Sequence, residues 1–319
     1  MTLQRILALD ALRGIAVVAM VIYHLSWDLS WFGHVEWNVA GGAGWRAFAA
    51  LIAGTFLFVA GISLSLAHHD AIRWGPFLKR EAVIVAAAAA VSVATFFAFG
   101  DTFVRFGILH AIAAASLIAL PFTRLPAIFA AAAAAFAATL PLWASGHVFD
   151  GQWLLWTGLG QPTYGAVDYV PLAPWSGATL LGVAVGKILI AHPDRAKASN
   201  EQLTGPAGRG IRLAGRHSLA IYLLHQPLLY GLFWGLSVSG LTPDRSVAIF
   251  ERDCTASCTA TFGDEAVCRA SCACTAQGLQ DQGVWQDLVA KPQDPDLRLT
   301  LNQTYSQCLR DTPADPLSN

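Results

Sequence analysis

Two histidines and an aspartate in the first forty residues have the types and the spacing that acid–base chemistry requires. His24 and Asp28 are four residues apart, so they share one face of a helix, and His34 follows six residues later. A carboxylate beside an imidazole orients the ring, and histidine titrates near neutral pH. We therefore take His34, His24 and Asp28 as candidate catalytic residues. The alternative is a polar helix end that binds lipid headgroups and water.

A second group of polar residues is mainly basic, which is typical of a site for a phosphate-bearing ligand. Its candidate binding residues are Arg13, Arg80 and Arg216. Two other interpretations stay open. Asp10 lies three residues before Arg13 and could simply neutralise it, and the basic run from Arg209 to Arg216 is also typical of anchoring at a cytoplasmic membrane face.

Further polar residues are expected on the same side of the membrane as His34. The substrate-side candidates are Arg105, His110 and Asp168. The alternative role of Arg105 and His110 is hydrogen bonding between helices. His225 and Gln226 are interpreted as structural, because Pro227 frees a backbone carbonyl one turn earlier and these two side chains can satisfy such groups.

The elements that position these residues are predicted to be membrane helices. The chain has 319 residues, of which 55% are hydrophobic and only 13% charged, whereas soluble domains are about 25% charged. A helix needs about 20 apolar residues to cross a bilayer. Seven runs meet this requirement, at 6–26, 46–67, 78–99, 103–120, 125–143, 171–191 and 214–236. We predict an all-α integral membrane protein with a bundle of about seven transmembrane helices.

Small residues within these runs predict close helix contacts in lipid. They are the alanines at 86–90 and 130–135, with Gly177, Gly182 and Gly186 on the sixth run. The net charge of −1 gives no electrostatic footprint for nucleic acid. We therefore expect membrane lipid as the surroundings of the bundle and no nucleic-acid partner.

The basic residues also predict an orientation, because cytoplasmic loops carry an excess of lysine and arginine. One set of loops and helix ends carries Arg13, Arg73, Lys79, Arg80, Arg124, Lys187, Arg209, Arg212 and Arg216. The alternate loops carry Asp28, Glu36, Asp101, Asp150 and Asp168. The N-terminus is therefore expected in the cytoplasm, and an odd number of spans places the C-terminal tail on the other side.

The tail, residues 241–319, has a different composition from the membrane domain at 1–240. It is polar and holds all six cysteines, and an even number of cysteines outside the cytoplasm favours disulfides. The first four have the spacing C-x3-C-x9-C-x3-C, which places cysteines on one face of each of two short helices that turn near Gly263. The nested pairs Cys254–Cys272 and Cys258–Cys268, with Cys274–Cys308, fit this hairpin, although six cysteines allow fifteen pairings. The tail has no histidine, which disfavours a zinc site, and we expect no metal.

The beginning of the chain resembles the heparan-alpha-glucosaminide N-acetyltransferase family of membrane acyltransferases. The resemblance rests on Asp10, Arg13-Gly14, Met20, and His34 followed by Trp37-Asn38, and it covers roughly the first sixty residues. It implies a short, bacterial-type relative in an inner membrane, with His34 of the H-x-x-W-N stretch as the residue that handles the acetyl group. Lysosomal members carry asparagine where this chain has His24, and this chain has one residue less between Met20 and His34.

Two functions are compatible with these features. The first is an acyltransferase that moves an acetyl group from cytoplasmic acyl-CoA to a sugar amine or hydroxyl, such as that of a glycan, on the outer side. The second is a multi-span transporter or a non-catalytic membrane protein, because intramembrane Arg, His and Asp also form proton relays. We see no internal repeat of the kind many transporters show. Seven spans is fewer than the lysosomal relatives have, and a homo-oligomer could supply the remainder.

Overall fold

The computed structural model describes residues 7–161, 165–192, 205–241 and 245–312. Within these ranges every regular element is a helix. The chain divides into two compact units, Met1–Gly235 and Leu236–Asn319. The predicted all-α membrane fold is confirmed.

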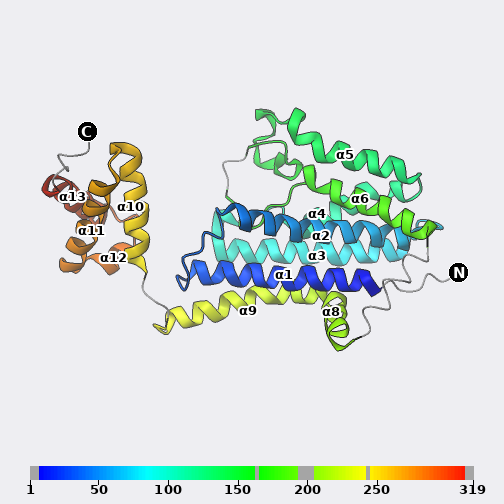
Figure 1. The fold of residues 1–319 in the computed structure, drawn as a ribbon, viewed down its shortest axis with the longest axis horizontal. Coiled ribbons are helices and arrows are strands. Elements are labelled where there is room, and N and C mark those ends of the chain that lie inside the picture. The colour runs from blue at the N-terminus through cyan, green and yellow to red at the C-terminus, as the bar shows by residue number, and fades with distance from the viewer. Residues whose placement is uncertain (1–6, 162–164, 193–204, 242–244, 313–319) are drawn as a thin grey trace. The chain divides into compact units, whose positions relative to one another are not determined.

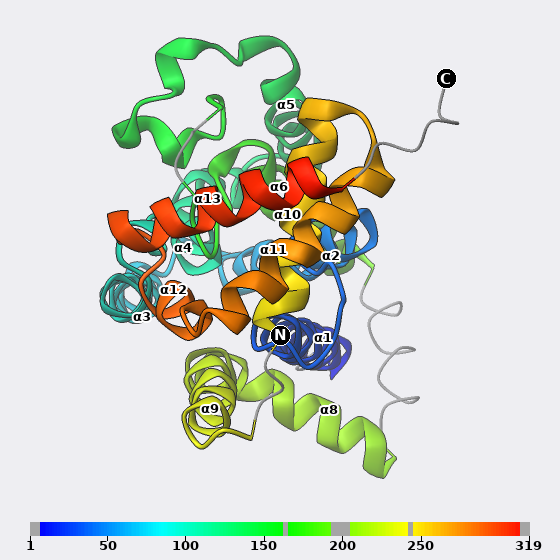
Figure 2. The same cartoon turned by 90° about the vertical axis from the view of Figure 1, so that its left-hand side faces the viewer.

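The first unit is a bundle of helices that lie side by side (Figure 1), and Figure 2 views the bundle nearly end-on. The long elements are α1 (Leu7–Trp31), α2 (Ala43–Ala67), α3 (Trp74–Phe99), α4 (Ile108–Ala119), α5 (Ala127–Ala144), α6 (Leu172–Ala191), α8 (Pro206–Arg216) and α9 (Ser218–Val238). Short 3-10 turns lie between them at Gly100–Thr102, Pro121–Thr123, His147–Phe149 and Gln152–Thr157.

Six helices of the described chain are long and apolar enough to cross a membrane: α1, α2, α3, α5, α6 and α9. Their bounds agree with six of the seven predicted runs to within about five residues. The fourth run was predicted as a full span at 103–120, and the structure does not form a helix over this whole range. Its helix, α4, has only 12 residues, about 18 Å of helix against the ~30 Å of a bilayer core.

The rest of the fourth run is extended rather than helical. The N–H of Val167 donates to the carbonyl of Thr102 at 2.9 Å, and the N–H of Val170 donates to that of Phe106 at 3.0 Å. The carbonyl groups of Thr102 and Phe106 therefore find their partners in the segment before α6, while the N–H and carbonyl groups of Val104 bond to the side chains of Thr95 and Ser92 in α3. A hydropathy pattern cannot distinguish this pairing from a helix, because the side chains are equally apolar in both conformations.

The fourth run nevertheless carries the chain from one end of the bundle to the other. Arg124, which follows α4, donates to the carbonyl oxygens of His69 at 3.1 Å and Asp70 at 2.6 Å. His69 and Asp70 follow α2, whose Ser63 accepts a hydrogen bond from Arg13 near the start of α1. We call this side of the bundle the Asp10 end and the opposite side the His34 end.

Small residues bring helices into close contact as predicted. A Cβ added to Gly61 of α2 would lie 2.0 Å from the carbonyl oxygen of Thr179 in α6, and one added to Gly182 would lie 2.1 Å from that of Phe58. Ala88 and the other buried alanines of the two alanine runs pack into the core in the same way. The α2–α6 contact therefore depends on residues without bulk.

Helix α8 crosses α1 at a second close contact, near the Asp10 end. A Cβ on Gly14 would lie 1.9 Å from the carbonyl oxygen of Ile211, and one on Gly215 would lie 1.8 Å from that of Asp10. Only glycine permits backbones to approach this closely. The crossing places the end of α8, with Arg216, beside the first turn of α1.

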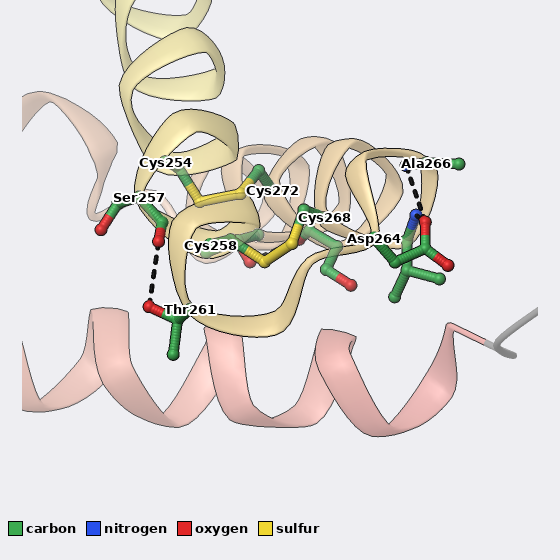
Figure 3. Close-up of a disulfide and its surroundings, with 11 residues drawn as sticks. Cys254, Ser257, Cys258, Thr261, Asp264, Ala266, Cys268 and Cys272 are labelled. Atoms are coloured by element: carbon green, nitrogen blue, oxygen red, sulfur yellow. Dashed lines mark hydrogen bonds between the residues drawn. A yellow bond between two sulfur atoms is a disulfide. The ribbon is translucent and has the colours of Figure 1, made fainter.

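The second unit is a small helical domain that contains all six cysteines. It consists of α10 (Ser246–Phe262), α11 (Glu265–Asp281), α12 (Trp285–Ala290) and α13 (Pro295–Asp311). Cys254–Cys272 and Cys258–Cys268 join α10 to α11, and Cys274–Cys308 joins α11 to α13. Figure 3 shows the two nested bridges and Asp264, whose side chain caps the N-terminus of α11. The predicted disulfides and their nested pairing are confirmed.

Candidate active site at the His34 end

Helix α1 ends in a turn that fixes the backbone of His34. Gly33 has φ 77°, in the left-handed region that favours glycine. The N–H of Gly33 donates to the carbonyl of Ser30 at 3.1 Å, and the N–H of His34 donates to that of Leu29 at 2.8 Å. These two bonds form a Schellman motif. His34 is therefore held against the last turns of α1, which also carry Asp28.

The loop after His34 has its own hydrogen bonds. Ser30 donates from Oγ to the carbonyl of Trp37 at 2.6 Å. The Oδ1 atom of Asn38 accepts the backbone N–H three residues later at 2.8 Å. The ring of Trp37 stacks on Trp45 of α2, with centroids 5.9 Å apart. Trp37 and Asn38 thus shape the loop that carries His34.

Helix α9 contributes two polar side chains to the same part of the bundle. The rings of His24 and His225 meet edge to face with centroids 4.9 Å apart. The Nε2 amide of Gln226 donates to Oδ1 of Asp28 at 3.1 Å. Asp28 is fully buried and His225 is 8% exposed. The two helices therefore meet at two neighbouring polar contacts, His24 with His225 and Asp28 with Gln226.

Aromatic residues of α9 hold the ring of His34. Its centroid lies 5.3 Å from that of Phe233. Phe32 stacks on Phe233 at 6.0 Å and contacts Tyr230 at 5.2 Å. Side chains of α9 therefore touch both His24 and His34, although no hydrogen bond joins these two histidines to each other in the described structure.

The proton position on His225 follows from its hydrogen bonds. Its Nδ1 lies 3.1 Å from the carbonyl oxygen of Ile221 and 2.8 Å from that of Tyr222. A carbonyl oxygen only accepts, so Nδ1 must carry the hydrogen. In the neutral ring the lone pair is then on Nε2. This is the tautomer in which Nε2 can take a proton from another group.

The Asp10 end carries a different kind of site. The carboxylate of buried Asp10 lies 3.7 Å from Nη1 of Arg13 and 3.8 Å from Nε of Arg216. Arg13 also donates from Nη2 to Ser63 of α2. The predicted Asp10–Arg13 ion pair is present, and α8 adds Arg216 to it. Two arginines, one from α1 and one from α8, therefore face this carboxylate.

Arg80 belongs to a separate polar group between α3 and α4. Its Nη1 lies 2.6 Å from Oε1 of Glu81 and 3.4 Å from Oγ of Ser116. His68 follows α2 near this group, and burial lowers the pKa of its imidazole, with Arg73 and Arg80 adding to the effect. The positive charge of this region therefore extends beyond the Asp10 cluster.

Asp168 caps the short helix α4. Its Oδ2 accepts the N–H of Ile108 at 3.0 Å, and an anion at a helix N-terminus is stabilising. A Cβ on Gly107 would lie 2.3 Å from this oxygen. Burial raises the pKa of Asp168, while the Ile108 hydrogen bond acts in the opposite direction.

His110 and Arg105 stabilise the extended segment before α4. His110 accepts the N–H of Gly107 at Nδ1, 3.3 Å away, and its Nε2 lies 3.4 Å from Oγ of Ser92. The guanidinium carbon of Arg105 lies 4.5 Å from the ring centroid of Phe103. The three predicted substrate-side residues therefore come together around the start of α4, and His110 and Asp168 have a capping role there.

The family model described as "Heparan-alpha-glucosaminide N-acetyltransferase, catalytic" matches residues 5–227, which is more than half of the chain. The chain belongs to this family. The heparan-alpha-glucosaminide N-acetyltransferase family consists of membrane acetyltransferases, so the resemblance at the N-terminus is confirmed and extends much further. The chain matches no curated protein and no solved structure. The match ends at Pro227, directly after His225 and Gln226.

Sequence reasoning placed His24, Asp28 and His34 together but interpreted His225 and Gln226 as structural. In the structure Nδ1 of His225 faces the carbonyl oxygens of Ile221 and Tyr222 in its own helix, which are not the carbonyl that Pro227 frees. The side chains also face α1, which no local pattern reveals across 198 positions. The extent of the acetyltransferase family match indicates that this part of α9 belongs to the catalytic domain, because the match includes α9 up to these residues.

Proposed function

We propose that this member of the acetyltransferase family moves an acetyl group from cytoplasmic acetyl-CoA to a sugar amine or hydroxyl on the opposite side of the membrane. The observation that carries the proposal is the difference between the two ends of α1. The Asp10 end holds two arginines against one carboxylate. The His34 end holds three imidazoles and a buried carboxyl group. One end suits a phosphate-bearing donor, and the other suits acyl transfer.

The donor is assigned to the Asp10 end. Arg13 and Arg216 both face Asp10, and the phosphate of the donor is assigned to their guanidinium groups. Arg80 is a further candidate, and the phosphate would compete there with Glu81. A planar guanidinium binds phosphate oxygens in a bidentate manner, which favours arginine for this role.

The acyl group is assigned to His34. A neutral imidazole can form an acyl-imidazole or take the proton of the attacking acceptor. The turn at Gly33 and the ring of Phe233 hold His34 at the end of α1. His24 and Asp28 lie in the preceding turns and complete the polar surroundings. Arg105, His110 and Asp168 are assigned to the side from which the acceptor approaches.

The orientation is part of the proposal. Three disulfides in the tail favour an oxidising compartment for the second unit. Six long helices and the shorter fourth run together cross the bundle seven times before the tail. Because this number is odd, the N-terminus and the Asp10 end are assigned to the cytoplasm. The basic residues at that end agree with this orientation. In a bacterial inner membrane the tail would lie in the periplasm, with a glycan as the acceptor.

Labelled acetyl-CoA tests the reaction class. Purified protein in detergent should release coenzyme A from acetyl-CoA faster when cell-envelope glycan is added, and the label should appear on the glycan. Mass spectrometry of glycans from cells with and without the protein would then identify the acceptor. Protein that binds acetyl-CoA but neither releases coenzyme A nor labels any envelope component would contradict the proposal.

A further inference from the structure

Buried polar atoms without hydrogen-bond partners gather where α9 meets the end of α1. In the described part of the chain these atoms include Oδ2 of Asp28, Nε2 of His34, Nε2 of His225 and Oε1 of Gln226. A buried polar atom without a partner costs about 1–3 kcal/mol, so native structures contain few of them. Asp28 and His225 are both more than nine-tenths buried. Three of these atoms lie on α1 and α9, and Nε2 of His34 lies just beyond the end of α1. Together they indicate that a ligand completes their hydrogen bonding.

These atoms have a common chemical character, because most of them can only accept. Gln226 uses its amide N–H to donate to Asp28, which leaves its oxygen as an acceptor. Oδ2 of an ionised Asp28 also accepts only. His225 carries its proton on Nδ1, where two carbonyl oxygens face it, so Nε2 of the neutral ring accepts too. The complementary ligand is therefore rich in hydrogen-bond donors, as a polyhydroxylated or amino sugar is.

We propose that Asp28, His225 and Gln226 form the binding site of the acceptor, and that Nε2 of His225 takes the proton from its attacking hydroxyl or amine. This inference rests on the proposed function and adds a catalytic residue to it. Asp28 and Gln226 accept hydrogen bonds from other donors of the sugar and orient it. Nothing in the local pattern of α9 distinguishes His225 from a structural histidine; the contact with α1 does.

The step conserves atoms and charge. The acceptor's oxygen or nitrogen forms a bond to the acyl carbon as its proton passes to Nε2 of His225. The bond from the acyl carbon to its carrier breaks, whether the carrier is the thioester sulfur or a nitrogen of His34. The imidazolium of His225 then returns the proton to that leaving group. The products are the acylated sugar and either coenzyme A or a regenerated His34.

His225 fits this role better than the other imidazoles for a geometric reason. Its Nδ1–H is held by two backbone carbonyls within its own helix, which fixes both the tautomer and the direction of Nε2. Gln226, the next residue, is held by Asp28. His34 has backbone hydrogen bonds and aromatic contacts, which suit a carrier of the acyl group. His24 packs against the ring of His225 and so restricts its movement.

Nitrogen NMR on the full chain tests the binding site directly. Histidine labelled with ¹⁵N would be incorporated into protein in detergent, and the His225 signals would be assigned as those missing from His225→Gln. We expect the Nδ1–H tautomer at neutral pH. Glucosamine or glucose, added without acetyl-CoA, should shift the Nε2 signal, and Asp28→Asn should weaken that response. An Nε2–H tautomer, or a signal that moves with neither sugar, overturns the assignment.

Acetyl transfer from acetyl-CoA to the sugar that binds tests the catalytic role. His225→Gln should lower kcat by roughly 10²–10⁴-fold, the usual contribution of a general base, with acetyl-CoA binding unchanged. Asp28→Asn should mainly raise the KM for the sugar. His147→Gln, at an exposed histidine in the 3-10 turn His147–Phe149, is the matched control and should behave as wild type. Near-normal turnover by His225→Gln overturns the role of His225 and leaves the proposed function intact. Binding at His225 without any transfer by wild type would instead reject the proposed function.

Discussion

The amide of Gln226 donates a hydrogen bond to the carboxyl group of Asp28 over 3.1 Å, and so joins helices that are 198 positions apart in the chain. One residue earlier, His225 packs its ring against His24. These contacts align the last apolar helix of the family match with the first one. Candidate residues of α1 and α9 therefore lie together in the bundle.

The Gln226–Asp28 hydrogen bond should stabilise the bundle measurably. A bond to a charged group contributes about 1.5–3 kcal/mol, so Gln226→Ala should lower the thermal unfolding temperature in detergent. In an Asp28→Asn background the same change should cost less, because the charge that needs the donor is gone. A double-mutant cycle isolates this coupling. Equal losses in both backgrounds would show that the bond contributes nothing specific.

The crossing of α1 and α8 should depend on Gly215. Alanine there would place a Cβ 1.8 Å from the carbonyl oxygen of Asp10, and overpacking of this kind costs about 1–3 kcal/mol. Gly210→Ala in the same helix is the matched control, since a Cβ there would meet nothing within 4 Å. We expect Gly215→Ala to unfold at a lower temperature and Gly210→Ala to match wild type. If the two variants unfold alike, α8 does not cross α1 this closely.

Arg13 should contribute to acyl-CoA binding through its charge. Arg13→Ala should weaken the binding of acetyl-CoA measured by titration calorimetry, and the difference from wild type should shrink at high salt, where the contact is already screened. Asp10→Asn should have the opposite effect, because it removes the carboxylate that competes with the phosphate. If the Arg13→Ala protein is less stable but binds acetyl-CoA with unchanged affinity, the cluster is only a structural ion pair.

The tail should carry no free thiol in the intact protein. Its six cysteines form three bridges, so a thiol reagent should label none of them under denaturing conditions until a reductant is added. Each bridge should contribute about 2–4 kcal/mol to the stability of this small domain. Replacing Cys274 and Cys308 together by serine tests the bridge between α11 and α13. Six reactive thiols in freshly isolated, unreduced protein would contradict both the pairing and the oxidising compartment.

Much of the fold could be predicted because its physical signals are local. A run of apolar residues specifies a membrane helix wherever it occurs, and Cys254, Cys258, Cys268 and Cys272 share helix faces because of their spacing. The pairing of residues 102–106 with the segment before α6 is different. It depends on the partners of backbone groups, for example Val170 with Phe106, and apolar side chains carry no information about such partners.

The candidate site likewise contains some contacts that the sequence could predict and others that it could not. His24 and Asp28 could be placed together because one helical turn separates them. His34 could be placed near them because it follows closely, but only the turn at Gly33 shows how it is held. The contact partners of Arg216 and His225 could not be predicted, since Asp10 and His24 are some two hundred positions away in the chain. Such contacts follow from the packing of whole helices.

The most direct test of the account is a sided transfer assay in proteoliposomes. Vesicles would be selected in which the tail is protected from external protease, so that the Asp10 end faces outward. Labelled acetyl-CoA would be added outside, with glucosamine or envelope glycan enclosed in the lumen. We predict that the label reaches the enclosed acceptor, and that His34→Ala abolishes this transfer while acetyl-CoA still binds. Label that appears only when donor and acceptor share one side of the membrane, or that reaches the lumen equally well with His34→Ala, would contradict the account.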